Sequence, residues 1–284
     1  MPVIVGIALV LGSCISGYLL AGGDLMALFQ PFELLIIGGA ALGAMFISNP
    51  MPISLGALKC FGTLLKGSQY TKTFYLELLA MMFQIFNKMR REGLIAIEGD
   101  IDDPHASPLF SSYPDVLKDH HAIEFICDYL RIMMAGDMAP HQLDNLMDVE
   151  LETHHHESLQ IATAWQKVGD ALPGFGIVAA VMGIVITMGS LGGPPEELGH
   201  HVGAALVGTF LGILLAYGFA SPFSVALEHK AHDEGIFYQV IKACLMASVN
   251  GVAPKIAVEF GRKVIPHSAR PSFTELEERV KQAK

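Results

Sequence analysis

The stretch LPGFGIVAAVMGIVITMG, residues Leu172–Gly189, contains no Asp, Glu, Lys or Arg. A second uncharged stretch, VGAALVGTFLGILLAYGFASPF, covers Val202–Phe223. The hydrocarbon core of a bilayer is about 30 Å thick, and an α-helix of about 20 apolar residues crosses it. The sequence LGGPPEE between them, Leu191–Glu197, predicts a turn. The two stretches are therefore predicted to form a transmembrane hairpin.

Two more apolar stretches lie at the N-terminus and predict a first hairpin. They cover Val3–Leu20 and Leu34–Ile47, with Ala21–Asp24 as the break and Glu33 at the outer edge of the second span. A cleaved signal peptide needs a basic region before its apolar core, and no Lys or Arg occurs before Lys59. Both stretches are therefore expected to be retained as membrane spans.

The distribution of basic residues predicts the orientation in the membrane. None of the 18 Lys and Arg residues lies in the predicted hairpin loops, 21–30 and 190–201; all lie within 51–170 or after residue 224. Lys and Arg favour the cytoplasmic side of a membrane. We therefore expect a multi-pass membrane protein with both termini and the middle segment in the cytoplasm. A soluble protein with four buried helices would not explain this distribution.

The predicted fold class is an all-α integral membrane protein with four transmembrane helices, a helical cytoplasmic domain between spans two and three, and helical stalk extensions. The predicted divisions are a first transmembrane hairpin, a cytoplasmic helical domain, a second transmembrane hairpin and a cytoplasmic C-terminal segment: 1–50, 51–170, 171–224 and 225–284. The stalk follows because the helical patterns of Pro140–Lys167 and Glu228–Ala247 continue directly into spans three and four.

Within the cytoplasmic domain, Thr71–Met89 has the apolar spacing of an amphipathic helix, and Arg90 lies at its basic end. Gly93 is expected to cap this helix, because glycine adopts the left-handed conformation that often follows a helix. Glu98 lies in the short segment after the cap. Near the C-terminus, Ser272 and Glu275 have the spacing of a capping box at the start of a last helix.

Composition and motifs exclude several classes of function. The chain has 284 residues, of which 52% are hydrophobic and 16% charged, and its net charge of −10 argues against a nucleic-acid partner. The four cysteines form no CxxC pair, so we expect no disulfide and no metal site. Adjacent residues His154–His156 fan out around a helix and cannot all bind one metal ion. No phosphate-binding or hydrolase motif occurs, so neither a cofactor nor enzymatic activity is expected.

Small residues recur every fourth position along span four, at Ala204, Gly208, Gly212 and Ala216. Such a ridge allows helices to approach closely in lipid. Ordinary packing of spans three and four accounts for part of this pattern. The same ridge would also suit the lining of an ion path or the binding of a partner.

Two prolines lie at the same predicted depth, near the cytoplasmic ends of spans three and four. They are Pro173 and Pro222. Pro173 fits the first turn of a helix, whereas Pro222 lies inside a helical pattern, where proline kinks a helix or frees a carbonyl. The pair is a candidate hinge.

Spans three and four contain hydroxyl groups but no acid, and the hydroxyls are those of Thr187, Thr209, Tyr217 and Ser221. Proteins that move ions normally hold an ionisable group in the membrane. If this chain conducts ions, the carboxylate that binds them must come from a partner subunit.

Several long strings resemble the MotA family of flagellar stator proteins, a branch of the MotA/TolQ/ExbB proton channels. They are GGDLMALFQPFELLIIGGAALGAM (22–45), VGDALPGFGIVAAVMGIV (168–185), VGTFLGILLAYGFASP (207–222), NGVAPKIAVEFGRKVIP (250–266) and RPSFTELEE (270–278). The resemblance implies a pentameric homo-oligomeric ring in membrane lipids around two copies of MotB, a single-span subunit anchored to peptidoglycan. It also implies that MotB supplies the ion-carrying aspartate and that ion flow drives torque on the rotor protein FliG.

The resemblance also implies a location in the bacterial inner membrane, with the cytoplasmic domain 51–170 facing the rotor and the hairpin 171–224 lining the ion path. By matching motifs, it assigns roles to residues of this chain. Arg90 and Glu98 fall at the rotor-contact charges, Pro173 and Pro222 at the paired prolines, and Thr209 at a hydroxyl facing the ion path. From the local sequence alone, Arg90 is interpreted as a charge that caps a helix and Glu98 as a solvated carboxylate.

Protons are the expected ion. In sodium-driven relatives a threonine stands where this chain has Ala180, and a methyl group cannot join the oxygen shell of Na⁺. Two alternatives remain: an ExbB/TolQ-like energiser of outer-membrane processes, and a non-conducting membrane scaffold. The energiser has three spans and a different helix layout; the scaffold predicts that Arg90 and the two prolines tolerate substitution.

Overall fold

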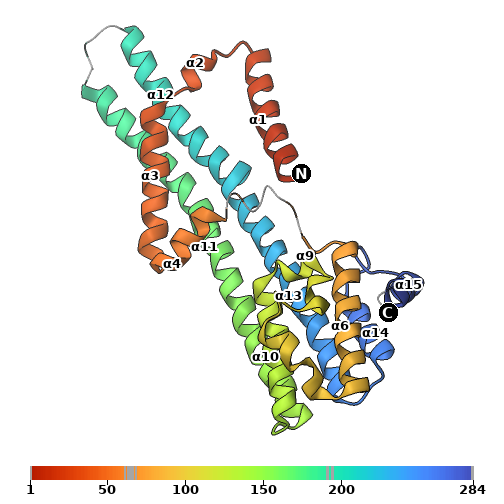
Figure 1. The fold of residues 1–284 in the computed structure, drawn as a ribbon. Coiled ribbons are helices and arrows are strands. Elements are labelled where there is room, and N and C mark those ends of the chain that lie inside the picture. The colour runs from red at the N-terminus through yellow and green to blue at the C-terminus, as the bar shows by residue number, and fades with distance from the viewer. Residues whose placement is uncertain are drawn as a thin grey trace. The chain divides into compact units, whose positions relative to one another are not determined.

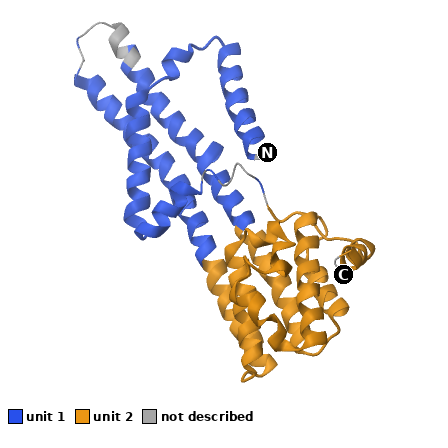
Figure 2. Ribbon diagram, viewed as in Figure 1, with its two compact units in different colours: residues 1–67, 157–230 blue, residues 68–156, 231–284 orange. Residues whose placement is uncertain are grey.

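The computed structural model describes residues 2–60, 62, 67, 69–189, 192 and 195–282, although not the side chains of residue 2, residues 195–198 or residue 200. The described residues form helices and connecting loops, with no β-strand among them (Figure 1). The chain divides into two compact units (Figure 2). We call 1–67 with 157–230 the membrane unit, and 68–156 with 231–284 the polar unit.

The membrane unit contains the four predicted spans, and four helices are long and apolar enough to cross a bilayer. Its helices are α1 (Pro2–Leu20), α2 (Leu25–Leu28), α3 (Pro31–Ser48), α4 (Met51–Lys59), α12 (Pro195–Leu215) and the π-helix η2 (Ala216–Ala220). Helices α11 (Pro140–Gly189) and α13 (Ser221–Val249) contribute residues to both units, as the sequence predicted for the stalk.

The core of the membrane unit follows one face of α3. Glu33, Ile37, Ala41 and Met45 are spaced one turn apart and are all buried. The three apolar members pack with Ala57, Ala164, Val168, Leu172 and Ala179. Leu9 and Leu20 of α1 are 68% and 89% exposed, as expected for side chains that face lipid or another subunit.

Side-chain hydrogen bonds tie α4, α11 and α13 together. The indole Nε1 of Trp165 donates to the carbonyl of Ala57 at 2.9 Å, and the buried Ser224 hydroxyl donates to the carbonyl of Ala162 at 2.8 Å. The Trp165 ring also packs edge-on against Phe223, with the ring centroids 6.1 Å apart. Helix α4 is short and begins after Pro50, at the start of the segment that the sequence predicts to be helical.

The polar unit is a cluster of helices around an apolar core. Besides its parts of α11 and α13, it contains α6 (Lys72–Glu92), the 3-10 helix η1 (Leu94–Ile97), α7 (Glu98–Asp102), α8 (Pro108–Ser111), α9 (Pro114–Leu117), α10 (His120–Ala135), α14 (Pro254–Val264) and α15 (Phe273–Gln282). Gly93 caps α6 with a φ of +93°, as predicted. Two short helices, α8 and α9, connect α7 to α10.

Helix α6 is the centre of the polar unit. Its residues Leu78, Leu79, Met81 and Met82 are inaccessible to solvent, and α14 and α15 both pack against this helix. Gly261 of α14 lies so close to Cys244 that a side chain at this position would meet the sulfur. Burial raises the pKa of the Cys244 thiol to about 12, and no disulfide joins the cysteines that the structure describes.

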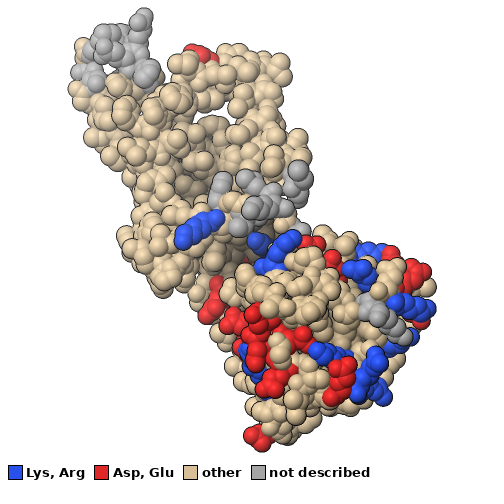
Figure 3. Space-filling model, in the orientation of Figure 1, with Lys and Arg blue, Asp and Glu red and all other residues tan. Residues whose placement is uncertain are grey.

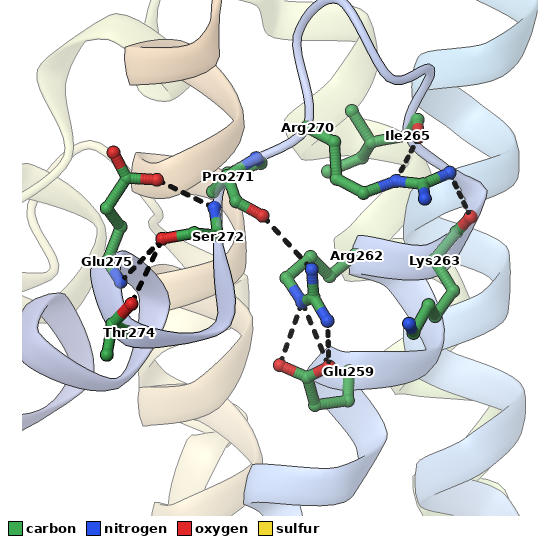
Figure 4. A network of polar contacts seen from close by, with 9 residues as sticks. All are labelled: Glu259, Arg262, Lys263, Ile265, Arg270, Pro271, Ser272, Thr274 and Glu275. Carbon is green, nitrogen blue, oxygen red and sulfur yellow. Dashed lines mark hydrogen bonds and ion pairs between the residues drawn. The ribbon is translucent and has the colours of Figure 1, made fainter.

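A network of polar contacts fixes the chain between α14 and α15 (Figure 4). The buried guanidinium of Arg262 donates to both carboxylate oxygens of Glu259 at 2.9 Å and to the carbonyl of Pro271 at 3.1 Å. The predicted capping box is confirmed, because the Ser272 N–H donates to Glu275 and the Glu275 N–H donates to the Ser272 hydroxyl. The string NGVAPKIAVEFGRKVIP thus includes a structural core of this unit.

The division into units differs from the predicted domain boundaries. Residues 51–67 and 157–170 belong to the membrane unit, and the polar unit combines 68–156 with the C-terminal segment. The reason is that α11 and α13 are continuous, so a compact unit can end partway along a helix. On the face drawn in Figure 3, charged side chains cover the polar unit, whereas the membrane unit is almost free of them.

Replacing Arg262 by Met should destabilise the polar unit by about 3–5 kcal/mol, because the Glu259 carboxylate and the Pro271 carbonyl lose a partner in a buried site. Scanning calorimetry of the detergent-solubilised protein should show a melting temperature lower by about 6–12 °C. The control is Lys281→Met, which removes an exposed ion pair and should leave melting unchanged. Equal melting of the two variants would contradict the role given to Arg262.

Candidate functional site

Helices α11 and α12 touch backbone to backbone through glycines. A methyl group built at Gly212 would lie 2.8 Å from both the Gly176 Cα and the Leu172 carbonyl oxygen. A methyl group at Gly176 would lie 3.1 Å from the Gly208 carbonyl oxygen and 3.5 Å from the Thr209 Cα. No side chain fits between the helices here, so the small residues set their separation.

The ridge of small residues predicted on span four is only partly enclosed. Gly208, Gly212 and Ala216 are buried, whereas Ala204 is half-buried. Ala216 is the first residue of the π-helix. The buried members face α3 and α11 of the same chain, so three of the four small residues serve packing within this chain.

A carboxylate lies against this glycine contact. Glu33, in the first turn of α3, is 8% exposed, and a methyl group built at Gly208 would lie 2.8 Å from its Oε2. Gly183 of α11 faces the Oε1 atom of the same group, at 3.6 Å from its own built methyl group. Among the described residues, no hydrogen-bond donor reaches Oε2. Glycine at 208 and 183 leaves the space that this side chain occupies.

The burial of Glu33 adds a group to which the sequence analysis gave no role. Spans three and four have no acid of their own, but α3 places one against both of them. The available signal was that Glu33 begins the buried series with Ile37, Ala41 and Met45, one helical turn apart.

The two prolines lie close to a backbone contact between α11 and α13. Proline has no N–H, so Pro173 cannot donate to the carbonyl of Gly169, four residues earlier. A methyl group at Gly169 would lie 2.7 Å from the Ser221 hydroxyl oxygen and 3.3 Å from the Ser221 nitrogen. Pro222 follows Ser221 directly, so both helices lose a regular hydrogen bond near one crossing point.

The helix before Pro222 has a different hydrogen-bond register. Residues Ala216–Ala220 form a π-helix, and the Ser221 N–H donates to the carbonyl of Ala216, five residues earlier. π-Helical turns inside α-helices are often found at functional sites. Pro173 differs, because α11 continues through it from Pro140 to Gly189. The two helices therefore differ in how their hydrogen-bond pattern is interrupted. Helix α11 contains only a proline, whereas a π-turn and a proline both occur where α12 meets α13.

The remaining predicted residues are placed as follows. Ala180 of α11 and Thr209 of α12 are both half-buried, and Thr209 lies beside Gly176. In the polar unit, Arg90 ends α6 and Glu98 begins α7, with η1 between them. Both side chains are exposed. They are therefore available to a partner, as a rotor contact requires.

The side chains of His154 and His155 do not point toward one common site. His154 lies 3.6 Å from a carboxylate oxygen of Glu234 and packs its ring on Tyr238, whereas His155 lies beside Gly235. Among the described residues, no group of three His, Cys, Asp or Glu side chains has the arrangement of a metal site.

The whole chain resembles known proteins closely. It is 46% identical over 284 residues to "Motility protein A" of Escherichia coli strain K12, covering 100% of this chain and 96% of that protein. The chain belongs to the motility protein A family. Residues 4–93 match the family described as "Motility protein A N-terminal", and residues 119–239 match the "MotA/TolQ/ExbB proton channel family".

More distant members of the motility protein A family share the fold. The chain is 37% identical to "Chemotaxis protein LafT" of Vibrio parahaemolyticus, over 98% of this chain and 97% of that protein. It matches a chain in the "flagellar MotAB stator complex from Bacillus subtilis" with a TM-score of 0.74 and 25% identity, and one in the "Structure of C. jejuni MotAB" with 0.78 and 20%. Each match covers 95% of this chain and 98% of the other.

Replacing Gly212 by Ala should force α11 and α12 apart, at a cost of about 1–3 kcal/mol. Calorimetry of the solubilised protein should show a lower melting temperature, and less protein should assemble in the membrane. Gly203→Ala on the same helix is the matched control, because a methyl group there meets nothing within 4 Å. If both variants melt alike, the backbone contact does not set the helix separation.

Replacing Glu33 by Gln keeps the shape of the side chain but removes its ionisation. We expect normal assembly and a clear loss of ion flux, because an ionisable group buried among membrane helices is costly unless it serves the ion pathway. Glu33→Asp should retain part of the flux. Proton uptake into vesicles containing the assembled complex provides the measurement, and wild-type uptake by the Gln variant would make Glu33 a structural residue only.

Proposed function

We propose that this chain is the ring-forming subunit of a proton-driven flagellar stator. The observation that carries the proposal is the 46% identity to a motility protein A over the full chain. Its four apolar helices support it, because a stator must span the inner membrane. Five copies would surround a MotB-like, single-span subunit anchored to peptidoglycan.

The proposed ion path uses carboxylates from two chains. The partner subunit supplies the acid that carries the ion across the membrane, because spans three and four contain none. Glu33 adds a second carboxylate near the outer ends of these spans, since it lies in the first turn of α3. Thr209 supplies a hydroxyl, and Pro173 and Pro222 allow the helices to respond to the ion.

Protons are the proposed ion. Ala180 presents a methyl group where a sodium site would need oxygen, and Thr209 alone is a poor cage for Na⁺, which is bound by several oxygen ligands. No cofactor is needed, and no enzymatic activity is proposed, since the ion gradient supplies the energy.

The proposed orientation places both termini and the polar unit in the cytoplasm. The support is the absence of Lys and Arg from 21–30 and 190–201. There the exposed Arg90 and Glu98 would contact the rotor protein FliG and transmit torque. An ExbB/TolQ-like energiser is less well supported, because residues 4–93 match the motility protein A N-terminal family.

Deleting the gene should leave cells that build flagella but do not swim. Swimming of the parent should stop with a protonophore and stay constant when external sodium is replaced by potassium. Tethered-cell rotation and flagellar staining provide the measurements. Normal swimming of the deletion strain would refute the stator role, whereas sodium-dependent swimming would refute only the choice of ion.

A further inference from the structure

Helix α4 presents an apolar face that no part of the described chain covers. Met51, Leu55 and Leu58 are 64%, 45% and 41% exposed, whereas Ser54 and Ala57 are fully buried. The three exposed residues follow one another at intervals of four and three positions, so they share one face of the helix. The outer face of α4 is thus its apolar one, as in a helix that lies against lipid rather than water.

This face continues the apolar surface of α3. Phe46 and Ile47, near the end of α3, are 38% and 90% exposed, and α4 begins three residues after α3 ends. The chain turns away from the axis of α3 at this point (Figure 1). A helix that follows a membrane span and keeps an exposed apolar face fits the boundary between headgroups and acyl chains, where such a face is buried to a depth of about 5–10 Å.

Trp165 supports the same position for α4. It is the only tryptophan of the chain, and its indole N–H donates to the carbonyl of Ala57 at 2.9 Å. Tryptophan is enriched where a membrane meets water, because its ring is apolar and its N–H is polar. The same hydrogen bond holds the buried face of α4 against α11, so the opposite face stays directed outward.

The charges next to α4 are basic. Between residues 34 and 76 the sequence contains three lysines and no Asp or Glu. Lys59 follows Leu55 by about one helical turn, so it lies beside the exposed apolar face. Lys167 of α11 donates to the carbonyl of Ser48 at 3.5 Å, which places its ammonium group where α3 leads into α4.

Neither lysine is neutralised by a carboxylate in the part of the chain that the structure describes. Lys59 and Lys167 are both exposed and form no ion pair there. The nearest acid along α11, Asp170, accepts a hydrogen bond from the Gln166 amide at 2.9 Å instead. Two cations beside an apolar face require a ligand that combines an anionic group with apolar chains, and an anionic phospholipid has both.

We propose that α4, Lys59 and Lys167 form a binding site for an anionic phospholipid of the cytoplasmic leaflet. The phosphate of the headgroup pairs with the lysines, and the acyl chains cover Met51, Leu55 and Leu58. The inference rests on the proposed orientation, which places this end of the membrane unit at the cytoplasmic side, where anionic lipids attract basic residues. It goes beyond the proposed function, because the ion path requires no particular lipid.

The first test measures lipid binding to the full chain assembled with its partner subunit. The complex is delipidated in a neutral detergent and melted at increasing concentrations of dioleoylphosphatidylglycerol. A ligand of the folded state raises the melting temperature, and the titration gives the affinity. A lysine near an anionic lipid contributes about fivefold to affinity, so the double variant Lys59→Gln/Lys167→Gln should bind about 25-fold more weakly.

The controls separate a lipid site from general charge effects. Dioleoylphosphatidylethanolamine or inorganic phosphate should not raise the melting temperature, and Lys59→Arg/Lys167→Arg should bind like the wild type, because arginine also pairs with phosphate. The matched control is Lys263→Gln, since Lys263 is an exposed lysine of the polar unit. Wild-type binding by the double Gln variant, equal weakening in Lys263→Gln, or an equal effect of phosphatidylethanolamine or inorganic phosphate would overturn the proposal.

The second test locates the acyl chains. A photo-crosslinking benzoylphenylalanine replaces Leu58 in cells, with the same probe at Ile95, which is 76% exposed in the polar unit, as the control. Position 58 should form an adduct with an anionic phospholipid, and position 95 should not. An adduct of position 58 with a second copy of this chain, with another protein or with a zwitterionic lipid would refute the site, as would no adduct. Swimming of the deletion strain tests the stator role separately, because lipid binding is measured without rotation.

Discussion

The close approach of α11 and α12 is the constraint on which the rest of the membrane unit depends. Gly176, Gly208 and Gly212 bring the two backbones together without intervening side chains. The hydrophobic effect does not drive helices together inside a bilayer, because the lipid chains are as apolar as the helix surfaces. Helices there associate through close packing and polar contacts. The same glycines leave the space in which α3 places Glu33. The glycines that allow the helices to approach closely therefore also make room for the buried carboxylate.

The sequence predicted the spans well, because a run of uncharged residues long enough to cross a bilayer has few other interpretations. The amphipathic helix α6 and the capping box at Ser272 were also recognisable from spacing. The sequence could not predict the contacts of Glu33, because the burial of a side chain at the edge of a span depends on which helices pack against that edge. The π-helix at Ala216–Ala220 was not predicted either, since it arises where α12 meets α13 in the packed structure.

The polar unit combines segments that are distant in the sequence. Residues 68–156 and 231–284 share one apolar core, in which α14 and α15 pack on α6 and the Arg262 network fixes the connecting chain. This arrangement gives residues near the C-terminus a structural role in the same core. Its Gly261 and Arg262 maintain the fold of a unit whose exposed residues, Arg90 and Glu98, lie elsewhere.

The π-turn between α12 and α13 changes the direction in which the side chains after it point. One additional residue in a single turn displaces every later side chain by about 100° around the axis, compared with an uninterrupted helix. The stripe that carries Gly208 and Gly212 therefore does not continue along α13, and a different set of side chains takes its place.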